Sequence, residues 1–190
     1  MAKTEPIRDL RQIRELAAYY QHLGQLRNHV LIVLALYTAL RISDLLRLTW
    51  DDVYDFDCHR VRKALTLREG KTGKAKTIAL NKDVVKALLA YAETAAPGRF
   101  LILNEKTRKA ICRTQAYRII RAAAKALRFA FKVSCHSLRK TFGYQAWKAG
   151  TPLAVIMEIF NHTSFAVTMR YLCISQDDVD RAYLRLQLLA

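Results

Sequence analysis

Apolar residues recur at helical spacing along most of this chain, and this periodicity constrains its fold more than any other feature. It predicts one helix from Ile7 to His22 and a second from Leu26 to Ala39. The same spacing returns in the C-terminal third, where a helix opens at Cys135 and ends at Gly150. We therefore expect a mainly helical domain.

The middle of the chain departs from this pattern. Short β-prone runs at 61–67 and 76–80 flank the segment 69–74, whose two glycines indicate a turn. Asn81 is a good cap for a helix over 84–94, which Pro97 and Gly98 would terminate, and a further helix is expected over 107–127. The predicted fold class is α+β, mainly helical, with a small antiparallel β-sheet that carries a basic hairpin.

Several predicted breaks fall beside polar residues. Ser43 can cap a short helix just after Arg41, and Thr151-Pro152 supplies a cap and a first-turn proline for the next helix. His162 and Tyr171 are nine positions apart, so one continuous helix would place them on opposite sides. A break at 163–164, where either hydroxyl can cap the following helix, would let them converge. A last helix is expected after Gln176, with apolar positions Val179, Tyr183, Leu186 and Leu189.

The net charge of +16 at pH 7 favours a polyanionic partner. The predicted helix over 107–127 is densely basic with hardly any opposing acid, which favours a surface that faces double-stranded DNA. Four scattered cysteines and a polar N-terminus without a signal-peptide core indicate a cytoplasmic protein, associated with the nucleoid. The longest apolar stretch, 30–40, is too short for a membrane span, which needs ~20 residues.

Six residues form an ordered set of basic and nucleophilic candidates. They are Arg41, Lys71, His136, Arg139, His162 and Tyr171. This pattern resembles the tyrosine recombinases, the integrase family of site-specific DNA recombinases. Residues 39–48 are similar to the first arginine motif of that family, residues 136–143 to its second, and 161–172 to the box that holds its last histidine and its tyrosine.

The resemblance implies a role for each residue of this set. Tyr171 would attack the DNA backbone and form a 3′-phosphotyrosyl bond, with His136 as its helper and Lys71 as the general acid that protonates the departing 5′ oxygen. Arg41 and Arg139 would each present a planar, charged fork to the phosphate, and His162 would add a hydrogen bond. No metal, cofactor or ATP is expected.

Further basic residues are predicted to contact DNA. They are Lys74, Lys76, Arg108, Lys109, Arg113, Arg118, Arg121 and Lys140.

The sequence departs from the family pattern at two backbone positions and in its extent. Ala39 and Asn161 each stand where glycine is usual, and asparagine tolerates a left-handed backbone better than most residues. We expect residues 1–190 to form a single catalytic domain, without the N-terminal core-binding domain of most members, as an excised domain or a naturally short protein. The family recombines as a tetramer on DNA, so we expect a homo-tetramer there and a monomer in isolation. The last helix could dock on its own domain or on a neighbour.

Other interpretations stay open at this point. A type IB topoisomerase-like enzyme would use the same chemistry but reseal the same strand, and a non-catalytic DNA-binding regulator could share the scaffold. Tyr144 and Tyr183 are rival nucleophiles whose positions match helix packing. The cysteines near the two histidines lack zinc-ligand spacing, and the acidic cluster 51–57 fits a solvated turn better than a metal nuclease site.

Overall fold

The computed structural model describes residues 4–95 and 99–187. Helices dominate, as predicted. Their bounds are α1 (Leu10–His22), α2 (Leu26–Tyr37), α3 (Ile42–Leu45), α4 (Trp50–Val53), α5 (Lys82–Ala92), α6 (Arg113–Ala126), α7 (Cys135–Lys148), α8 (Leu153–Phe160), α9 (Phe165–Leu172) and α10 (Gln176–Arg185). The ends at Pro97 and Gly98, and the apolar position Leu189, lie outside the described residues.

The strands form three antiparallel pairs instead of one sheet. These are β1 (Tyr54–Asp55) with β2 (Arg60–Val61), β3 (Ala64–Arg68) with β4 (Ala75–Ala79), and β5 (Leu103–Asn104) with β6 (Lys109–Ala110). The β3–β4 hairpin pairs Ala64 with Ala79 and Arg68 with Ala75, so its turn carries residues 69–74 as predicted.

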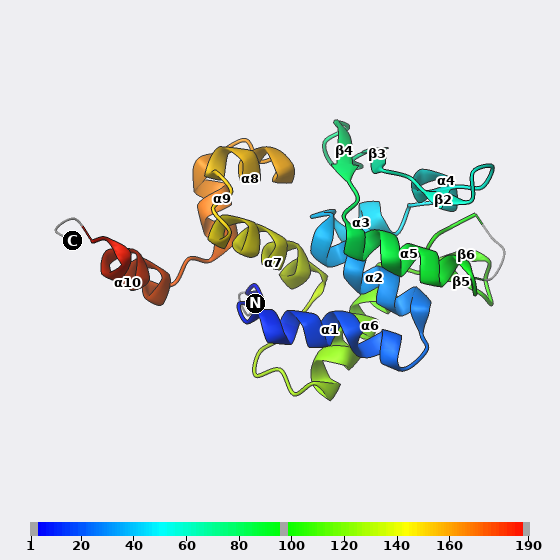
Figure 1. Ribbon diagram of the computed structural model, residues 1–190, viewed down its shortest axis with the longest axis horizontal. Coiled ribbons are helices and arrows are strands. Elements are labelled where there is room, and N and C mark those ends of the chain that lie inside the picture. Colours follow the sequence, from blue (N-terminus) through cyan, green and yellow to red (C-terminus); the bar gives the residue numbers. More distant parts are fainter. Residues whose placement is uncertain (1–3, 96–98, 188–190) are drawn as a thin grey trace.

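The central element is α2, which is buried from Asn28 to Leu36 and contacts α1, α5, α6 and α7. Its sequence is apolar on all sides, which is typical of a helix enclosed by others. The large core surrounds it, and a smaller apolar cluster of Ala39, Ile156, Phe160 and Leu172 joins α7, α8 and α9. Figure 1 shows these three helices together at one end, with α10 extending beyond them.

Three local predictions were wrong for identifiable reasons. The helix expected over 107–127 begins only at Arg113, because the Asn104 side chain accepts from the backbone N–H groups of Lys106 and Thr107 and closes the β5–β6 turn. Ser43 lies inside α3, and Arg41 itself, with extended backbone, occupies the N-cap. Pro152 is the N-cap of α8 and not its first helical residue.

The acidic cluster and one histidine are accounted for by structure. Asp52 closes a capping box with Thr49 at the start of α4, and Asp55 accepts from the backbone N–H of Cys58. His29 bonds through its ring nitrogen to the carbonyl of Ala17, 2.7 Å away, inside the core. In the part of the chain that is described, no helix has both the length and the apolar character of a membrane span.

Candidate active site

Tyr171 lies in the last turn of α9 and points at the first turn of α7. Its hydroxyl is 3.1 Å from Nδ1 of His136, and the two rings meet edge to face with centroids 4.8 Å apart. Burial raises the pKa of Tyr171, an effect that the charges of Arg139 and Arg41 partly offset. The tyrosine is therefore a phenol at neutral pH and needs a proton acceptor to act as a nucleophile.

His136 is suited to be that acceptor. Burial lowers its pKa, and the positive charges of Lys140, Arg139 and Arg41 lower it further. The imidazole is consequently neutral at pH 7, which leaves one ring nitrogen able to take a proton.

His162 reaches Tyr171 because the chain breaks between α8 and α9, as the spacing required. Asn161 ends α8 in the left-handed region at φ 52°, and Ser164 is the N-cap of α9, although its hydroxyl makes no cap hydrogen bond. The rings of His162 and Tyr171 lie 5.1 Å apart, and Nδ1 of His162 is 3.0 Å from the hydroxyl of Thr168. Burial, together with the charges of Arg139 and Arg41, lowers the pKa of His162 to about 4.

Arg139 is buried on α7 and held by two backbone carbonyls. Its guanidinium donates to the carbonyl of Ala39 and, at 3.0 Å, to that of Phe160, whose ring it also covers. Ala39 delivers its carbonyl from a left-handed backbone at φ 53°, a conformation that glycine adopts more readily than alanine. The fork of Arg139 is thereby fixed before any ligand binds.

Arg41 is held by Glu69, an acidic residue that sequence reasoning missed. Nη1 of Arg41 donates to Oε2 of Glu69 at 2.8 Å, and the same oxygen accepts from Nδ2 of Asn161 at 2.7 Å and from the hydroxyl of Thr72 at 3.0 Å. The only hint in the sequence is that Glu69 stands alone among the basic residues of its hairpin.

The three lysines of the β3–β4 hairpin differ in their exposure to solvent. Lys71 and Lys74 are exposed at the turn between β3 and β4. Lys76 is half-buried, with Nζ 2.6 Å from the carbonyl of Ile159 on α8. Burial, reinforced by the charges of Arg139 and Arg41, lowers the pKa of Lys76 to about 8.

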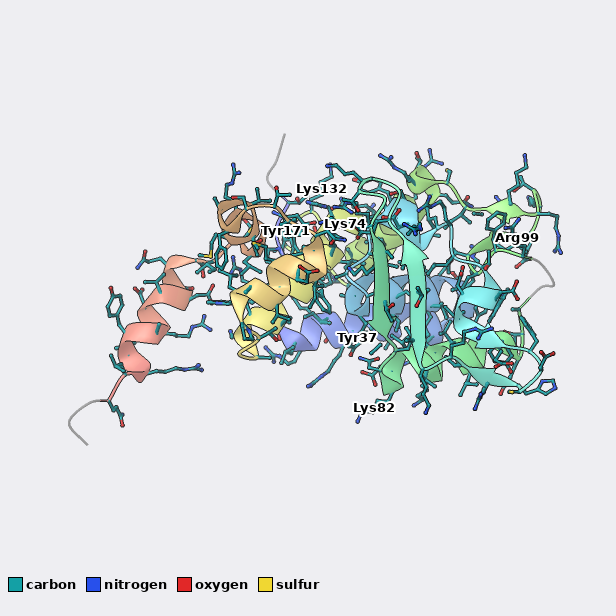
Figure 2. All side chains as sticks on the ribbon, turned by 90° about the horizontal axis from the view of Figure 1, so that it is seen from above. Tyr37, Lys74, Lys82, Arg99, Lys132 and Tyr171 are labelled. Carbon is teal, nitrogen blue, oxygen red and sulfur yellow. The ribbon has the colours of Figure 1, made fainter. Side chains whose placement is uncertain are left out.

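The residues predicted to contact DNA fall into different surroundings. Arg108, Lys109, Arg113 and Arg118 are exposed, and Arg121 is half-buried. Lys140 is instead buried at 6% exposure, and its Nζ donates to the carbonyl of Thr4 and to Sγ of Cys173. The amine also lies 5.4 Å from the centre of the Tyr171 ring, so it faces the candidate site instead of open solvent. Lys132, which was not predicted, is exposed on the same edge of the molecule as Lys74 and Tyr171 (Figure 2).

A sequence model of the phage integrase family matches residues 8–177, which is most of the chain. The chain belongs to the phage integrase family. The probable integrase/recombinase YoeC of Bacillus subtilis is 35% identical over 179 residues, which cover 94% of each chain. This membership confirms the expected fold and class of enzyme, a tyrosine-type site-specific DNA recombinase.

Solved structures share the integrase fold at low sequence identity. The XerA recombinase matches with a TM-score of 0.79 at 21% identity, over 98% of this chain and 66% of its own. The XerH site-specific recombinase, solved in a post-cleavage complex with a palindromic difH substrate, matches with a TM-score of 0.76 at 16% identity. That match covers 97% of this chain and 54% of XerH, so the chain spans about half of that protein.

Within this integrase fold, α7 and the α8–α9 turn bring four of the six predicted catalytic residues together, and Glu69 connects a fifth, Arg41, to them. The sixth, Lys71, lies outside this cluster on the exposed hairpin turn. The assembled groups comprise a phenol, two neutral imidazoles and two fixed guanidinium groups. Such a set can bind a phosphodiester, stabilise added negative charge and exchange a proton with the phenol.

Proposed function

We propose that this integrase cleaves and rejoins DNA through a covalent 3′-phosphotyrosyl intermediate on Tyr171. Oη of Tyr171 attacks the phosphorus, its proton passes to His136, and the bond from phosphorus to the 5′ oxygen breaks as Lys71 protonates that oxygen. Attack by a 5′ hydroxyl of another strand reverses these steps. One phosphoester bond forms for each that breaks, so the reaction needs no ATP.

Arg41, Arg139 and His162 bind the phosphate oxygens in this proposal. Negative charge grows on the non-bridging oxygens during attack, and permanently charged forks held in place beforehand stabilise it. With two guanidinium groups in this role, the reaction does not require a metal ion. Lys71 is assigned as the proton donor because it lies on the hairpin turn, where its side chain can move to the departing oxygen.

The single observation that carries the proposal is the contact of Tyr171 with His136. Of the rival nucleophiles, Tyr144 is buried with its hydroxyl bonded to Asp178 at 2.7 Å, and Tyr183 is 77% exposed on α10. The hydroxyl of Tyr144 is thus engaged in attaching α10, with Arg8 and Lys148 over its ring. Of these three tyrosines, Tyr171 is the one whose hydroxyl contacts a histidine.

Double-stranded DNA is the proposed partner. Two observations support it: the net charge of +16 and the similarity to XerH, which was solved bound to its difH substrate. We further propose that recombination takes place in a homo-tetramer on two duplexes. In support, α10 projects from the body (Figure 1) and exposes Tyr183, Leu184 and Leu186 at 77%, 81% and 65%, which suits docking on a second copy better than packing on its own domain.

The test is covalent trapping on a nicked suicide substrate that contains the native recombination site. Wild-type protein should form a protein–DNA adduct, and Tyr171→Phe should form none while it binds DNA with nearly unchanged affinity. Tyr144→Phe is the matched control and should still form the adduct. An adduct in the Tyr171→Phe variant would refute the nucleophile assignment.

A second assay separates recombination from strand relaxation. Two differently labelled DNA sites should exchange partners in the presence of the wild-type protein. Resealing of each strand to its original partner alone would instead indicate topoisomerase-like activity.

A further inference from the structure

Glu69 is a carboxylate enclosed among the positive charges of the candidate site, beside Arg41 and Lys76. Its side chain has no exposed surface, although it lies next to the exposed turn of the β3–β4 hairpin. Oε2 accepts all three of its hydrogen bonds, while Oε1 is buried without a hydrogen-bond partner among the described residues. Nζ of Lys76 lies 4.0 Å from Oε1. Burying a carboxylate is costly, so a position with these partners requires an explanation.

The three donors to Glu69 come from three separate parts of the chain. Arg41 is the N-cap of α3, Thr72 belongs to the hairpin turn, and Asn161 is the left-handed residue that ends α8. Asn161 directly precedes His162. One carboxylate oxygen therefore connects the segment of the arginine proposed to bind phosphate, the hairpin turn that carries Lys71, and the segment of the histidine proposed to bind phosphate.

The surroundings of Glu69 keep its carboxylate negatively charged. Burial alone would raise the pKa of Glu69, but hydrogen bonds from Asn161 and Arg41 and the charge of Arg41 outweigh it and lower the pKa. The carboxylate is thus ionised at neutral pH and offsets the repulsion among Arg41, Arg139 and Lys76 before DNA binds.

Glu69 holds one nitrogen of the Arg41 guanidinium and does not block a phosphate from binding the rest of the group. Only Nη1 of Arg41 is bonded to the carboxylate, which leaves the other side of the guanidinium fork for a ligand. The Arg41 side chain is 22% exposed whereas that of Glu69 is fully enclosed, so a phosphate can reach the arginine without displacing the carboxylate.

We propose that Glu69 is a positioning residue that orients Arg41 and, through Asn161, the turn that carries His162. This inference rests on the proposed function, in which Arg41 and His162 bind the scissile phosphate. It also gives a purpose to an asparagine at this left-handed position. Asparagine adopts the left-handed backbone and adds an amide donor for Glu69, which glycine lacks.

The experiment measures single-turnover adduct formation at saturating suicide substrate for Glu69→Gln, Asn161→Gly and the double variant. Glutamine keeps the size of the side chain but removes its charge. Glycine keeps the left-handed backbone but removes the donor, so this variant retains the fold even if Glu69→Gln does not. Glu158→Gln is the matched control, because it removes an exposed carboxylate three residues before Asn161.

A positioning role predicts a slower rate constant in the fraction of protein that reacts. We expect Glu69→Gln to lower that rate constant on the order of 10- to 100-fold, with DNA affinity changed less than about threefold. Asn161→Gly should lower the rate constant about tenfold. In the double variant the reduction should be smaller than the product of the two single reductions, because both substitutions remove the same contact. Glu158→Gln should react at the wild-type rate.

Several outcomes would overturn this inference while leaving the proposed function intact. One is a wild-type rate constant in Asn161→Gly or in a folded Glu69→Gln. Another is a reduced amplitude at an unchanged rate constant, which would indicate a purely structural role. Failure of the proposed function is distinguishable, since wild-type protein would then form no adduct that depends on Tyr171.

Discussion

At the scale of single residues, burial and the nearby positive charges together set the protonation states of the site. The charges of Arg139 and Arg41 add to burial and lower the pKa values of both His136 and His162. Both imidazoles are therefore neutral at pH 7, and the arginines carry the permanent positive charge of the site. The same charges stabilise the phenolate of Tyr171 as its proton leaves.

Besides Lys71 and Lys74 at its exposed turn, the hairpin carries Lys76, and the structure distinguishes the surroundings of Lys71 and Lys76 as proton donors. Lys76 is held by the carbonyl of Ile159, whereas Lys71 is exposed at the turn. We predict that Lys71→Ala lowers the rate of adduct formation by about 10²- to 10⁴-fold, the usual contribution of a general acid. The measurement is single-turnover cleavage of the suicide substrate.

A substrate with sulfur in place of the 5′ bridging oxygen identifies the donor directly. A thiolate leaves without protonation, so this substrate should restore the rate of Lys71→Ala close to that of wild type. Lys76→Ala, in contrast, should be slow on both substrates, because it removes a charge near Arg41 and Arg139 and not the departing proton. If the sulfur substrate instead restored the rate of Lys76→Ala, Lys76 would be the general acid.

At the scale of secondary-structure elements, α7 is the platform on which the site is assembled. It carries His136 and Arg139, and Gly143 lets α8 and α9 approach it closely. A Cβ atom at Gly143 would lie 2.5 and 2.6 Å from ring atoms of Phe160, whose ring packs against Tyr171 with centroids 4.9 Å apart. The absence of a side chain at this position therefore helps to set where the nucleophile lies.

The start of α10 is attached to the body by Asp178. This buried carboxylate accepts from Tyr144 and Ser175 and pairs with Arg8 at 3.0 Å. Burial alone would raise the pKa of Asp178, but hydrogen bonds from Ser175 and Tyr144 and the charge of Arg8 outweigh it and lower the pKa from 3.8 to about 2. A carboxyl whose pKa is lowered on folding stabilises the fold above its unfolded pKa, and this contribution disappears as the pH falls through the folded value.

We therefore predict that Asp178→Asn lowers the free energy of unfolding by about 2 kcal/mol at pH 7. The difference from wild type should shrink as the pH falls from about 4 to about 2, as measured by urea unfolding at each pH. Asp180→Asn is the control, since Asp180 is exposed on the same helix and should have little effect. A difference that persists unchanged at pH 2 would contradict the ionic explanation.

Sequence reasoning found those elements that local signals determine. The cap at Asn81, the β3–β4 hairpin and the break before α9 each depend on residues close together in the chain. Ordered motifs likewise pointed to Tyr171 and its partners. Glu69 and the burial of Lys140 could not be predicted, because both depend on contacts between segments distant in sequence, such as Glu69 with Asn161 and Lys140 with Cys173.

At the scale of the whole molecule, exposed lysines lie both on the edge that carries Tyr171 and on the opposite one (Figure 2). Figure 2 shows Lys74 and Lys132 on the same side as Tyr171, while Lys82 lies at the opposite edge. Lys74, Lys82 and Lys132 are all exposed. This arrangement allows the edge that binds DNA to be tested with variants that remove the same charge from different sides.

DNA binding should depend steeply on salt, because each lysine or arginine that contacts a phosphate releases a counterion. For ~6 to 10 phosphate contacts the affinity should fall ~10³- to 10⁵-fold between about 50 and 200 mM salt. Lys74→Gln and Lys132→Gln should each reduce the slope of log K against log salt by about one, and together by about two. Lys82→Gln removes the same charge from the far edge and should leave the slope unchanged. Fluorescence anisotropy with labelled duplex over this salt range measures the wild type, the three single variants and the double variant. An equal loss of slope in Lys82→Gln would mean that DNA does not bind along the edge that carries Tyr171.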